Sequence, residues 1–537
     1  MVEILKRSYF LAFFSGILLL SFSSCDSHYK VPESINPENF VKLNEGGFLL
    51  NEEKFFPIMI NYVADFRMAE GQCILGVHSL YEKPKVYEYF SADSIELQRD
   101  EHLKLIKEMG FNTIRLCMDR VWPVGDSIAY PADGNLLYLN HDNKLIFDAL
   151  TSFLESAGEQ DLKVLMLIPP AVRNENIEKF TIDFLKAFNG NNVIFAYDFN
   201  NEPLYDREHS AIPKHEVYEI VSEWKEWMET YAPYQLLTIG YSEPIEVFSW
   251  DPSILPVDFL SFHTYNPLRV PNEIYWYANY SDKPWMIGET ALLADGDKFP
   301  FQWQTDFMKA TFDMVVACGG IGFGWWGFQE VPLVDYAEEG TGLMTSDGVI
   351  YTSDSLLPIQ AKFKPAVAEV KKLVPSPPSM DCVRPSNYFN MVGYSNYVLK
   401  GVLVDEENKP IEGGVVRGWN EYYSIGQNTF TDKDGKFELY SNDEVYHVMI
   451  SAPKMEMRQF HEKIIYDAIG EIPFNADSLP NRDLEYQNID YRDIMEIDSA
   501  TQQINFFEYR TEEYLPLYYS QSLDSIRLSP WNEVKKR

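Results

Sequence analysis

Nearly continuous apolar runs alternate with amphipathic stretches along most of the chain. Strands that are covered on both faces have such runs, and here they lie at 55–63, 111–118, 162–169, 192–199, 235–242, 257–265, 283–290 and 320–328. Helical spacing of apolar residues occurs between them, at 94–110, 143–158, 176–190, 215–232 and 301–320. The alternation predicts an α/β fold, and the eight runs favour a (β/α)8 TIM barrel over 26–378. The alternative, an open doubly wound sheet, requires a glycine-rich phosphate turn that the sequence lacks.

Two smaller features flank the first predicted strand. Residues 40–56 alternate in polarity and predict a hairpin that turns at Glu45, Gly46 and Gly47. The insertion 64–94 predicts a loop that borders a substrate groove.

The pattern changes after the barrel. Prolines and serines predict a linker at 379–395, and 396–455 alternates in short runs with turns at Glu407–Asn408 and Asp434–Gly435. These runs predict a small all-β sandwich domain. Its "DKDG" turn lacks the remaining ligands of a calcium loop, so a hairpin turn is the better interpretation. The polar, acidic extension 456–537 either completes this sandwich or docks on the barrel, and no function is predicted for it.

The first 25 residues predict an export signal. Lys6 and Arg7 precede an apolar run that is short for a membrane span and ends in "SFSSC". We interpret it as a lipoprotein signal that leaves Cys25 lipidated on a bacterial cell envelope; an uncleaved anchor helix or a plain secretory signal is the alternative. The spacing of Cys73, Cys117, Cys318 and Cys382 indicates neither a zinc site nor a disulfide framework, so buried thiols are expected at Cys117 and Cys318.

Composition narrows the possible partners. With 81 acidic and 45 basic residues the net charge is −36, which repels nucleic-acid backbones, so no nucleic-acid partner is expected. Aromatic residues make up 15% of the chain; a barrel core accounts for most of them, and some suit stacking on sugars.

Two glutamates mark the candidate chemistry. Asn201 and Glu202 end the fourth run in "FNNEP", and Glu289 ends the seventh in "WMIGET". Barrel enzymes hold their reacting groups at the carboxyl ends of strands, so these carboxylates can face each other across the barrel mouth. A pair of carboxylates is the machinery of glycosidic bond cleavage, with one proton donor and one nucleophile or base.

Five motifs in order carry a family resemblance. "NTIRL", "FNNEP", "FHTY", "IGET" and "GWW" resemble the retaining (β/α)8 glycosidases of glycoside hydrolase clan A, in particular family 5. The C-terminal β segment resembles the carboxypeptidase regulatory-like domain, a transthyretin-type sandwich that implies a spacer or a docking module. Pro169 and Pro170 stand where many cellulase-like members carry a histidine, so the sugar is not fixed.

The resemblance implies a role for each matched residue. Glu202 corresponds to the acid/base, which must hold a proton near neutral pH, and Glu289 to the nucleophile, which must stay ionised. The other matched residues would support the pair or contact the sugar: Arg115, Asn201, His263, Tyr265 and Trp326. Two weaker candidates for substrate contact are Asn61, which ends strand one, and Trp122, in the loop after strand two. Taken singly, Arg115 is better explained by a strand-end ion pair, His263 by a core position and Trp326 by barrel packing. Their joint placement at five strand ends reverses that preference.

The combined prediction is a retaining glycoside hydrolase, anchored to a membrane, that cleaves a β-mannan or β-glucan type of polysaccharide or oligosaccharide without cofactor or metal. An envelope protein could bind its C-terminal β domain. One alternative is a glycan-binding surface lipoprotein on a barrel without turnover. Another is an inverting hydrolase, whose carboxyl groups lie farther apart.

Overall fold

The computed structural model describes residues 35–69, 72–77, 91–123, 143–205, 207–210, 212–267, 269–330, 340–345, 362–376, 380–385, 397–420, 426–441, 444–461, 496–497, 504–505 and 519–531. The predicted signal, the lipidation site Cys25 and most of 462–518 lie outside these ranges. Within them, no helix combines the length and the apolar character needed to cross a membrane.

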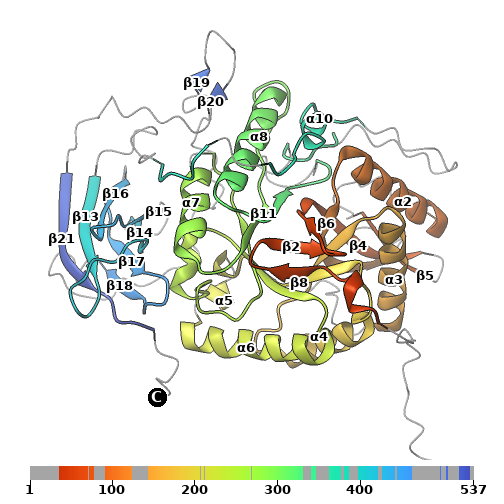
Figure 1. The fold of residues 1–537 in the computed structure, drawn as a ribbon, viewed down its shortest axis with the longest axis horizontal. Coiled ribbons are helices and arrows are strands. Elements are labelled where there is room, and N and C mark those ends of the chain that lie inside the picture. The colour runs from red at the N-terminus through yellow and green to blue at the C-terminus, as the bar shows by residue number, and fades with distance from the viewer. Residues whose placement is uncertain are drawn as a thin grey trace, which may run out of the picture. The chain divides into compact units, whose positions relative to one another are not determined.

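A closed ring of parallel strands forms the centre of the protein (Figure 1). Its members in the described ranges are β4 (Ile58–Ala69), β6 (Thr113–Pro123), β7 (Lys163–Leu167), β8 (Ile194–Asn201), β9 (Leu236–Tyr241), β10 (Leu260–His263), β11 (Trp285–Glu289) and β12 (Phe323–Trp325). Each strand pairs in parallel with the next, and β12 pairs with β4 to close the ring. All eight coincide with predicted strands, so the (β/α)8 barrel is confirmed.

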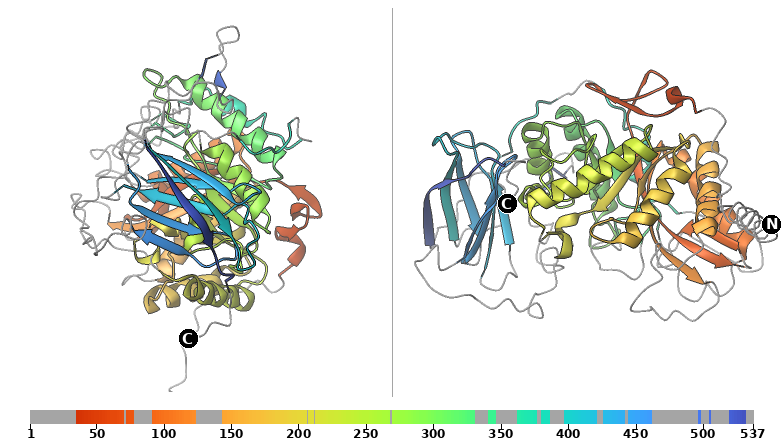
Figure 2. Two further views of the ribbon diagram at one scale, coloured as in Figure 1. Left: turned by 90° about the vertical axis from the view of Figure 1, so that its left-hand side faces the viewer. Right: turned by 90° about the horizontal axis from the view of Figure 1, so that it is seen from below.

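Helices surround this ring (Figures 1 and 2). They are α2 (Ala92–Met109), α3 (Asn143–Glu159), α4 (Glu175–Phe188), α5 (Arg207–Ser210), α6 (Lys214–Tyr231), α7 (Val270–Tyr280), α8 (Phe301–Ala317) and α10 (Val367–Val370). Local sequence sets the ends of α2: the Ser91 side chain accepts a bond from Ser94 N, and Gly110 adopts φ 108°. Short 3-10 helices follow β8 and β9, at η4 (Pro203–Tyr205) and η5 (Pro244–Phe248).

A small antiparallel sheet lies against the N-terminal ends of the barrel strands. It consists of β1 (Lys42–Asn44), β2 (Gly47–Leu50) and β3 (Glu53–Phe55), so the predicted hairpin has a second turn. Asn51 and Glu52 form this turn with φ 52° and 66°. Phe48 packs edge-on against Phe195 and Phe259, with ring centroids 5.7 and 5.0 Å away.

The prediction of a groove loop at 64–94 is wrong for residues 64–69 and 72–77, which form strands. Residues 64–69 continue β4 beyond the ring and pair antiparallel with β5 (Gln72–Val77), while 78–90 lie outside the described ranges. Phe66, Ile74 and Val77 are buried in this hairpin. Burial of these apolar side chains stabilises a hairpin where the polar residues between them suggested a loop.

Two facing sheets, one antiparallel and one mixed, follow the barrel, as Figure 2 shows. One holds β14 (Val415–Trp419), β15 (Gly426–Phe430), β17 (His447–Ser451) and β18 (Arg458–His461); the other holds β13 (Tyr397–Val404), β16 (Lys436–Ser441) and β21 (Tyr519–Arg527). We call them together the β domain. Strand β21 pairs in parallel with β13, so the extension contributes a strand to the sandwich. A separate ladder joins β19 (Glu496–Ile497) and β20 (Ile504–Asn505).

A disulfide joins Cys318, just after α8, to Cys382 in the predicted linker. The expectation of a buried thiol at Cys318 is therefore wrong. The two cysteines are 64 residues apart and belong to a helix end and an irregular segment, so no local spacing announced the pair. Cys117 is a buried thiol, as expected.

Candidate active site

Glu202 and Glu289 approach each other at the carboxyl ends of their strands. Glu202 follows the last residue of β8, and Glu289 is the last residue of β11. One carboxylate oxygen of each lies within 4.8 Å of the other, and a ring nitrogen of His263 lies within the same distance of both. The Glu202 side chain is 21% exposed and that of Glu289 is 6% exposed. The structure thus brings the predicted pair together with Glu202 more open to solvent.

Both oxygens of Glu289 accept hydrogen bonds from the protein. Arg115 donates from Nη1 to Oε1, and the Tyr265 hydroxyl donates to Oε2. His263 Nδ1 lies 3.5 Å from Oε1. A guanidinium and a phenol that both donate to one carboxylate fix its orientation, which a nucleophile requires.

Arg115 is fully buried and organises the residues behind Glu289. Its Nε and Nη2 donate to Asp198 Oδ2 at 3.0 and 2.8 Å. Its Nη2 also donates to Asn201 Oδ1 at 2.7 Å, and its Nη1 to Asn61 Oδ1 at 3.1 Å. One guanidinium therefore links β4, β6, β8 and β11 at the mouth of the barrel.

Asn61 and Asp198 lie beneath the mouth of the barrel, where both accept hydrogen bonds from Arg115. Asn61 is 1% exposed, and its Nδ2 donates to the carbonyl oxygens of Gly288 and Trp325 at 3.0 and 3.1 Å. It orients Arg115 from within β4, and the predicted substrate contact does not fit this burial. Asp198 was not predicted; a charged residue inside the apolar run 192–199 is the signal that marks it.

His263 connects the two carboxylates. Its Nδ1 lies 2.7 Å from Glu202 Oε1, and burial lowers its pKa to about 4, so the ring is neutral at neutral pH. Glycines on both neighbouring strands make room for the ring: a Cβ added at Gly240 or Gly288 would lie 3.0 or 3.1 Å from its atoms. A side chain at either position would require the ring to shift by a few tenths of an ångström, and at Gly288 it would also clash with Ser261 Oγ.

The backbone of Glu202 aims its side chain into the mouth. Glu202 has φ 48°, in the left-handed region, and its N–H donates to Gly240 O at 2.6 Å. Asn201 is exposed and directs its Oδ1 to Arg115, which leaves its amide Nδ2 available to a ligand. The turn after β8 thereby places an amide beside a carboxylate.

Trp325, the last residue of β12, and Trp326, which follows it, differ in burial. Trp325 is fully buried and its Nε1 donates to Thr341 O at 3.3 Å, whereas Trp326 is partly exposed. Exposure fits the choice of Trp326 as the residue that faces a sugar. Trp122 lies in β6, not in a loop as predicted, and its side chain lies outside the described part.

Three ligand atoms within 4.8 Å can also hold a metal ion, and Glu202, His263 and Glu289 form such a group. Arg115 and Tyr265 already bond to both oxygens of Glu289. A cation here would share Glu289 with a guanidinium, which disfavours it electrostatically.

The sequence matches no family model, and no curated protein is significantly similar to it. Similar solved structures include the glycoside hydrolase family 5 mannosidase from Rhizomucor miehei, with 13% identity over 63% of this chain and 97% of that chain and a TM-score of 0.42. The exo-beta-1,4-mannosidase Op5Man5 from Opitutaceae bacterium strain TAV5 is 15% identical over 63% and 61%, with a TM-score of 0.43. The endo-1,4-beta-mannanase from Rhizomucor miehei is 14% identical over 62% and 99%, with a TM-score of 0.38. Similarity at this level says nothing about substrate or mechanism.

Proposed function

We propose that the protein is a retaining glycoside hydrolase that cleaves β-glycosidic bonds of a mannan or glucan type by double displacement. The supporting observation is the approach of Glu202 and Glu289 to within 4.8 Å, oxygen to oxygen, at the mouth of a (β/α)8 barrel. Retaining enzymes hold their carboxyl groups about 5 to 5.5 Å apart, and inverting enzymes about 6.5 to 9.5 Å apart to admit a water. The observed spacing therefore favours direct attack by a carboxylate.

In the first step, Glu289 attacks the anomeric carbon while Glu202 donates its proton to the departing glycosidic oxygen. The carbon–oxygen bond to the leaving group breaks, and an ester forms between the sugar and Glu289. In the second step, Glu202 takes a proton from water, whose oxygen attacks the same carbon and releases Glu289. Each carboxyl group returns to its initial state.

Asn201 and Trp326 suit contacts with the sugar. The Nδ2 of Asn201 suits the sugar 2-hydroxyl, a hydrogen bond that strengthens as positive charge develops on the ring. The partly exposed indole of Trp326 suits the flat face of a sugar in the neighbouring subsite. The Asn201 contact would bind the transition state more tightly than the ground state, and the Trp326 contact would hold the substrate.

The alternative of a glycan-binding barrel without turnover is less favoured by the same residues. Arg115 and Asp198 are each fully buried, and burying charges is costly. Sugar binding alone does not require an ion pair that holds a carboxylate at the mouth. The arrangement is better explained by chemistry at Glu289.

We also propose that the chain is a lipoprotein of the bacterial cell envelope, lipidated at Cys25 and with a transthyretin-type β domain. The Cys318–Cys382 disulfide supports export, because disulfides persist in oxidising compartments. Binding of an envelope protein by the β domain stays a prediction.

A panel of β-mannans, β-glucans, xylans and galactans, with products sized by chromatography, tests the hydrolase proposal. Glu289→Ala should abolish hydrolysis, and azide with a dinitrophenyl glycoside should restore turnover as a glycosyl azide. Glu229→Ala, an exposed change on α6, is the matched control and should behave as wild type. Wild-type hydrolysis that survives Glu289→Ala would refute the assignment.

A further inference from the structure

Two buried glutamates hold the segment that follows Glu202. Leu204 N in η4 donates to Glu246 Oε1 at 3.3 Å, and the Tyr205 hydroxyl donates to Glu243 Oε1 at 3.2 Å. Both glutamates lie just after β9, the strand whose Gly240 accepts the N–H of Glu202. The position of the acid/base segment thus depends on where these two side chains are held.

Glu243 bridges the barrel and the β domain. Its Oε1 accepts from Arg269 Nη1 at 2.8 Å, on the barrel side. Its Oε2 accepts from Asn428 Nδ2 at 3.0 Å and lies 3.6 Å from Arg417 Nη1, both in the β domain. Burial alone would raise the pKa of Glu243, but Arg269 and Arg417 hold it below its ordinary value. The bridge is therefore an ionised carboxylate.

The contact between barrel and β domain is buried elsewhere as well. Lys214 Nζ, 4% exposed as a residue, donates to Asp251 Oδ2 and to Ser451 Oγ, both at 3.0 Å. Trp276 Nε1 in α7 donates to Gly413 O at 2.8 Å. Buried partners of this kind fix the β domain on the barrel, so Asn428 has a defined position relative to Glu243.

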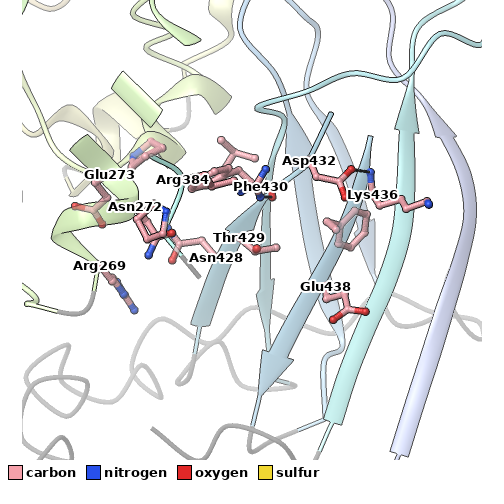
Figure 3. Close-up of a pocket in the computed structure, with 14 residues that line it drawn as sticks. Arg269, Asn272, Glu273, Arg384, Asn428, Thr429, Phe430, Asp432, Lys436 and Glu438 are labelled. Carbon is pink, nitrogen blue, oxygen red and sulfur yellow. Dashed lines mark hydrogen bonds between the residues drawn. The ribbon is translucent and has the colours of Figure 1, made fainter. Parts of the chain in front are cut away.

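A cavity of about 320 Å³ runs along this junction. Figure 3 shows Arg269 and Glu273 on the barrel side of the cavity and Asn428 on β15 opposite them. The Asn428–Glu243 hydrogen bond therefore lies at its edge, and a change of side chain at Asn428 has room to be accommodated without overpacking.

We infer that the β domain positions the proton donor: Asn428 holds Glu243, Glu243 holds Tyr205, and Tyr205 fixes the turn that carries Glu202. The inference rests on the proposed hydrolase function. Asn428, Glu243 and Tyr205 are positioning residues, and none of them takes part in bond making. The β domain is then part of the working enzyme as well as a spacer.

The dependence on leaving group tests this inference directly. Cleavage of a glycoside with a poor leaving group requires proton donation, whereas a dinitrophenol departs without it. For Asn428→Ala, kcat/KM should fall about tenfold on a methylphenyl glycoside and change less than about twofold on the dinitrophenyl glycoside, as expected when only general-acid catalysis is impaired. A loss of folded protein would lower both rates equally.

Four further variants sharpen the test. Asn428→Asp keeps the shape but removes the donor and should match or exceed the effect of Asn428→Ala. Tyr205→Phe should reproduce the same selective loss, and the double variant should be no worse than either single one, because coupled residues are not additive. Tyr280→Phe removes another hydrogen bond between the barrel and the β domain, from the Tyr280 hydroxyl to Glu412 Oε1 at 3.0 Å. It should leave kcat/KM on both substrates unchanged.

The outcomes separate the two proposals. A wild-type protein that cleaves no glycoside of the panel would overturn the hydrolase and this inference with it. If the wild type is active but Asn428→Ala lowers kcat/KM equally on both substrates, or does not lower it at all, the positioning role alone is overturned. Additive losses in the double variant would show that Asn428 does not act through Tyr205.

Discussion

Arg115 and Asp198 form an ion pair in which both side chains are fully buried. The guanidinium donates twice to one oxygen, Oδ2, while Oδ1 accepts from Gly240 N at 2.7 Å. Asp198 therefore sets the orientation of the group that holds Glu289. Asp198 lies on β8, the strand that ends next to Glu202.

Asp198→Asn should lower both stability and activity. The change leaves Arg115 with one counter-charge fewer in a buried site, which costs about 3 kcal/mol of unfolding free energy. A tilted guanidinium would misplace Glu289, and kcat should fall about 100-fold. Chemical denaturation and initial rates measure the two effects. Asp313→Asn, in an exposed helical pair with Lys309, is the control and should change neither by a measurable amount. An unchanged kcat in Asp198→Asn would contradict the role of the pair.

Glu246 should make the protein less stable as pH rises. Burial raises the pKa of Glu246 to about 8, against about 4.3 in an unfolded chain, so the folded state alone holds this proton between those values. Stability from this group is complete below the lower value and is lost as pH rises toward 8. Glu246→Gln, which stays neutral, should show a smaller fall in unfolding free energy from pH 5 to pH 8. Burial also raises the pKa of Glu273 to about 8, so this residue lowers the unfolding free energy over the same pH range in wild type and in Glu246→Gln alike.

Glu243 should show the opposite dependence, although it lies only three residues away. Arg269 and Arg417 overcome the effect of burial and lower its pKa, so its stabilisation is present above the unfolded value and is lost as pH falls. Glu243→Gln should therefore be less stable than wild type at pH 7, and the difference should shrink toward pH 4. Urea titrations at pH 4, 5, 7 and 8 test both variants. Parallel curves for the two substitutions would contradict the assigned charges.

The Cys318–Cys382 disulfide should stabilise the protein by about 2 to 4 kcal/mol, because it closes a long loop in the unfolded chain. Reductant should lower the denaturation midpoint of wild type but not that of the Cys318→Ser/Cys382→Ser variant. Cys73→Ser, at a thiol outside the bridge, serves as control and should retain the response to reductant. Peptide mapping without reductant that finds Cys318 and Cys382 unlinked would contradict the bridge.

The barrel was predictable because its strands are apolar over their whole length and its helices keep a regular spacing. Helix α7 was not predicted, because its aromatic residues have low helix propensity; Pro271 in its first turn is compatible with a helix start. The hairpin of β4 and β5 was interpreted as a loop, since buried Asp65 and Arg67 interrupt its apolar pattern. Burial against neighbouring elements decided both cases, and a single sequence does not show it.

The candidate site was predictable where polar residues end apolar strands, as at Glu202 and Glu289. The register between strands was not predictable. Asn61 and Arg115 are register partners on β4 and β6, which places the amide under the guanidinium and away from the mouth. The Glu243–Asn428 bond joins residues 185 positions apart in different domains, and neither side chain carries a local signal for the other.

Covalent trapping tests the central claim most directly. A 2-deoxy-2-fluoro glycosyl fluoride of the sugar identified by the panel slows both steps but retains a good leaving group, so the ester accumulates. Peptide mass spectrometry should find one glycosyl group per chain, on Glu289. An adduct on another residue, or hydrolysis to a product of inverted anomeric configuration with no adduct, would contradict the account.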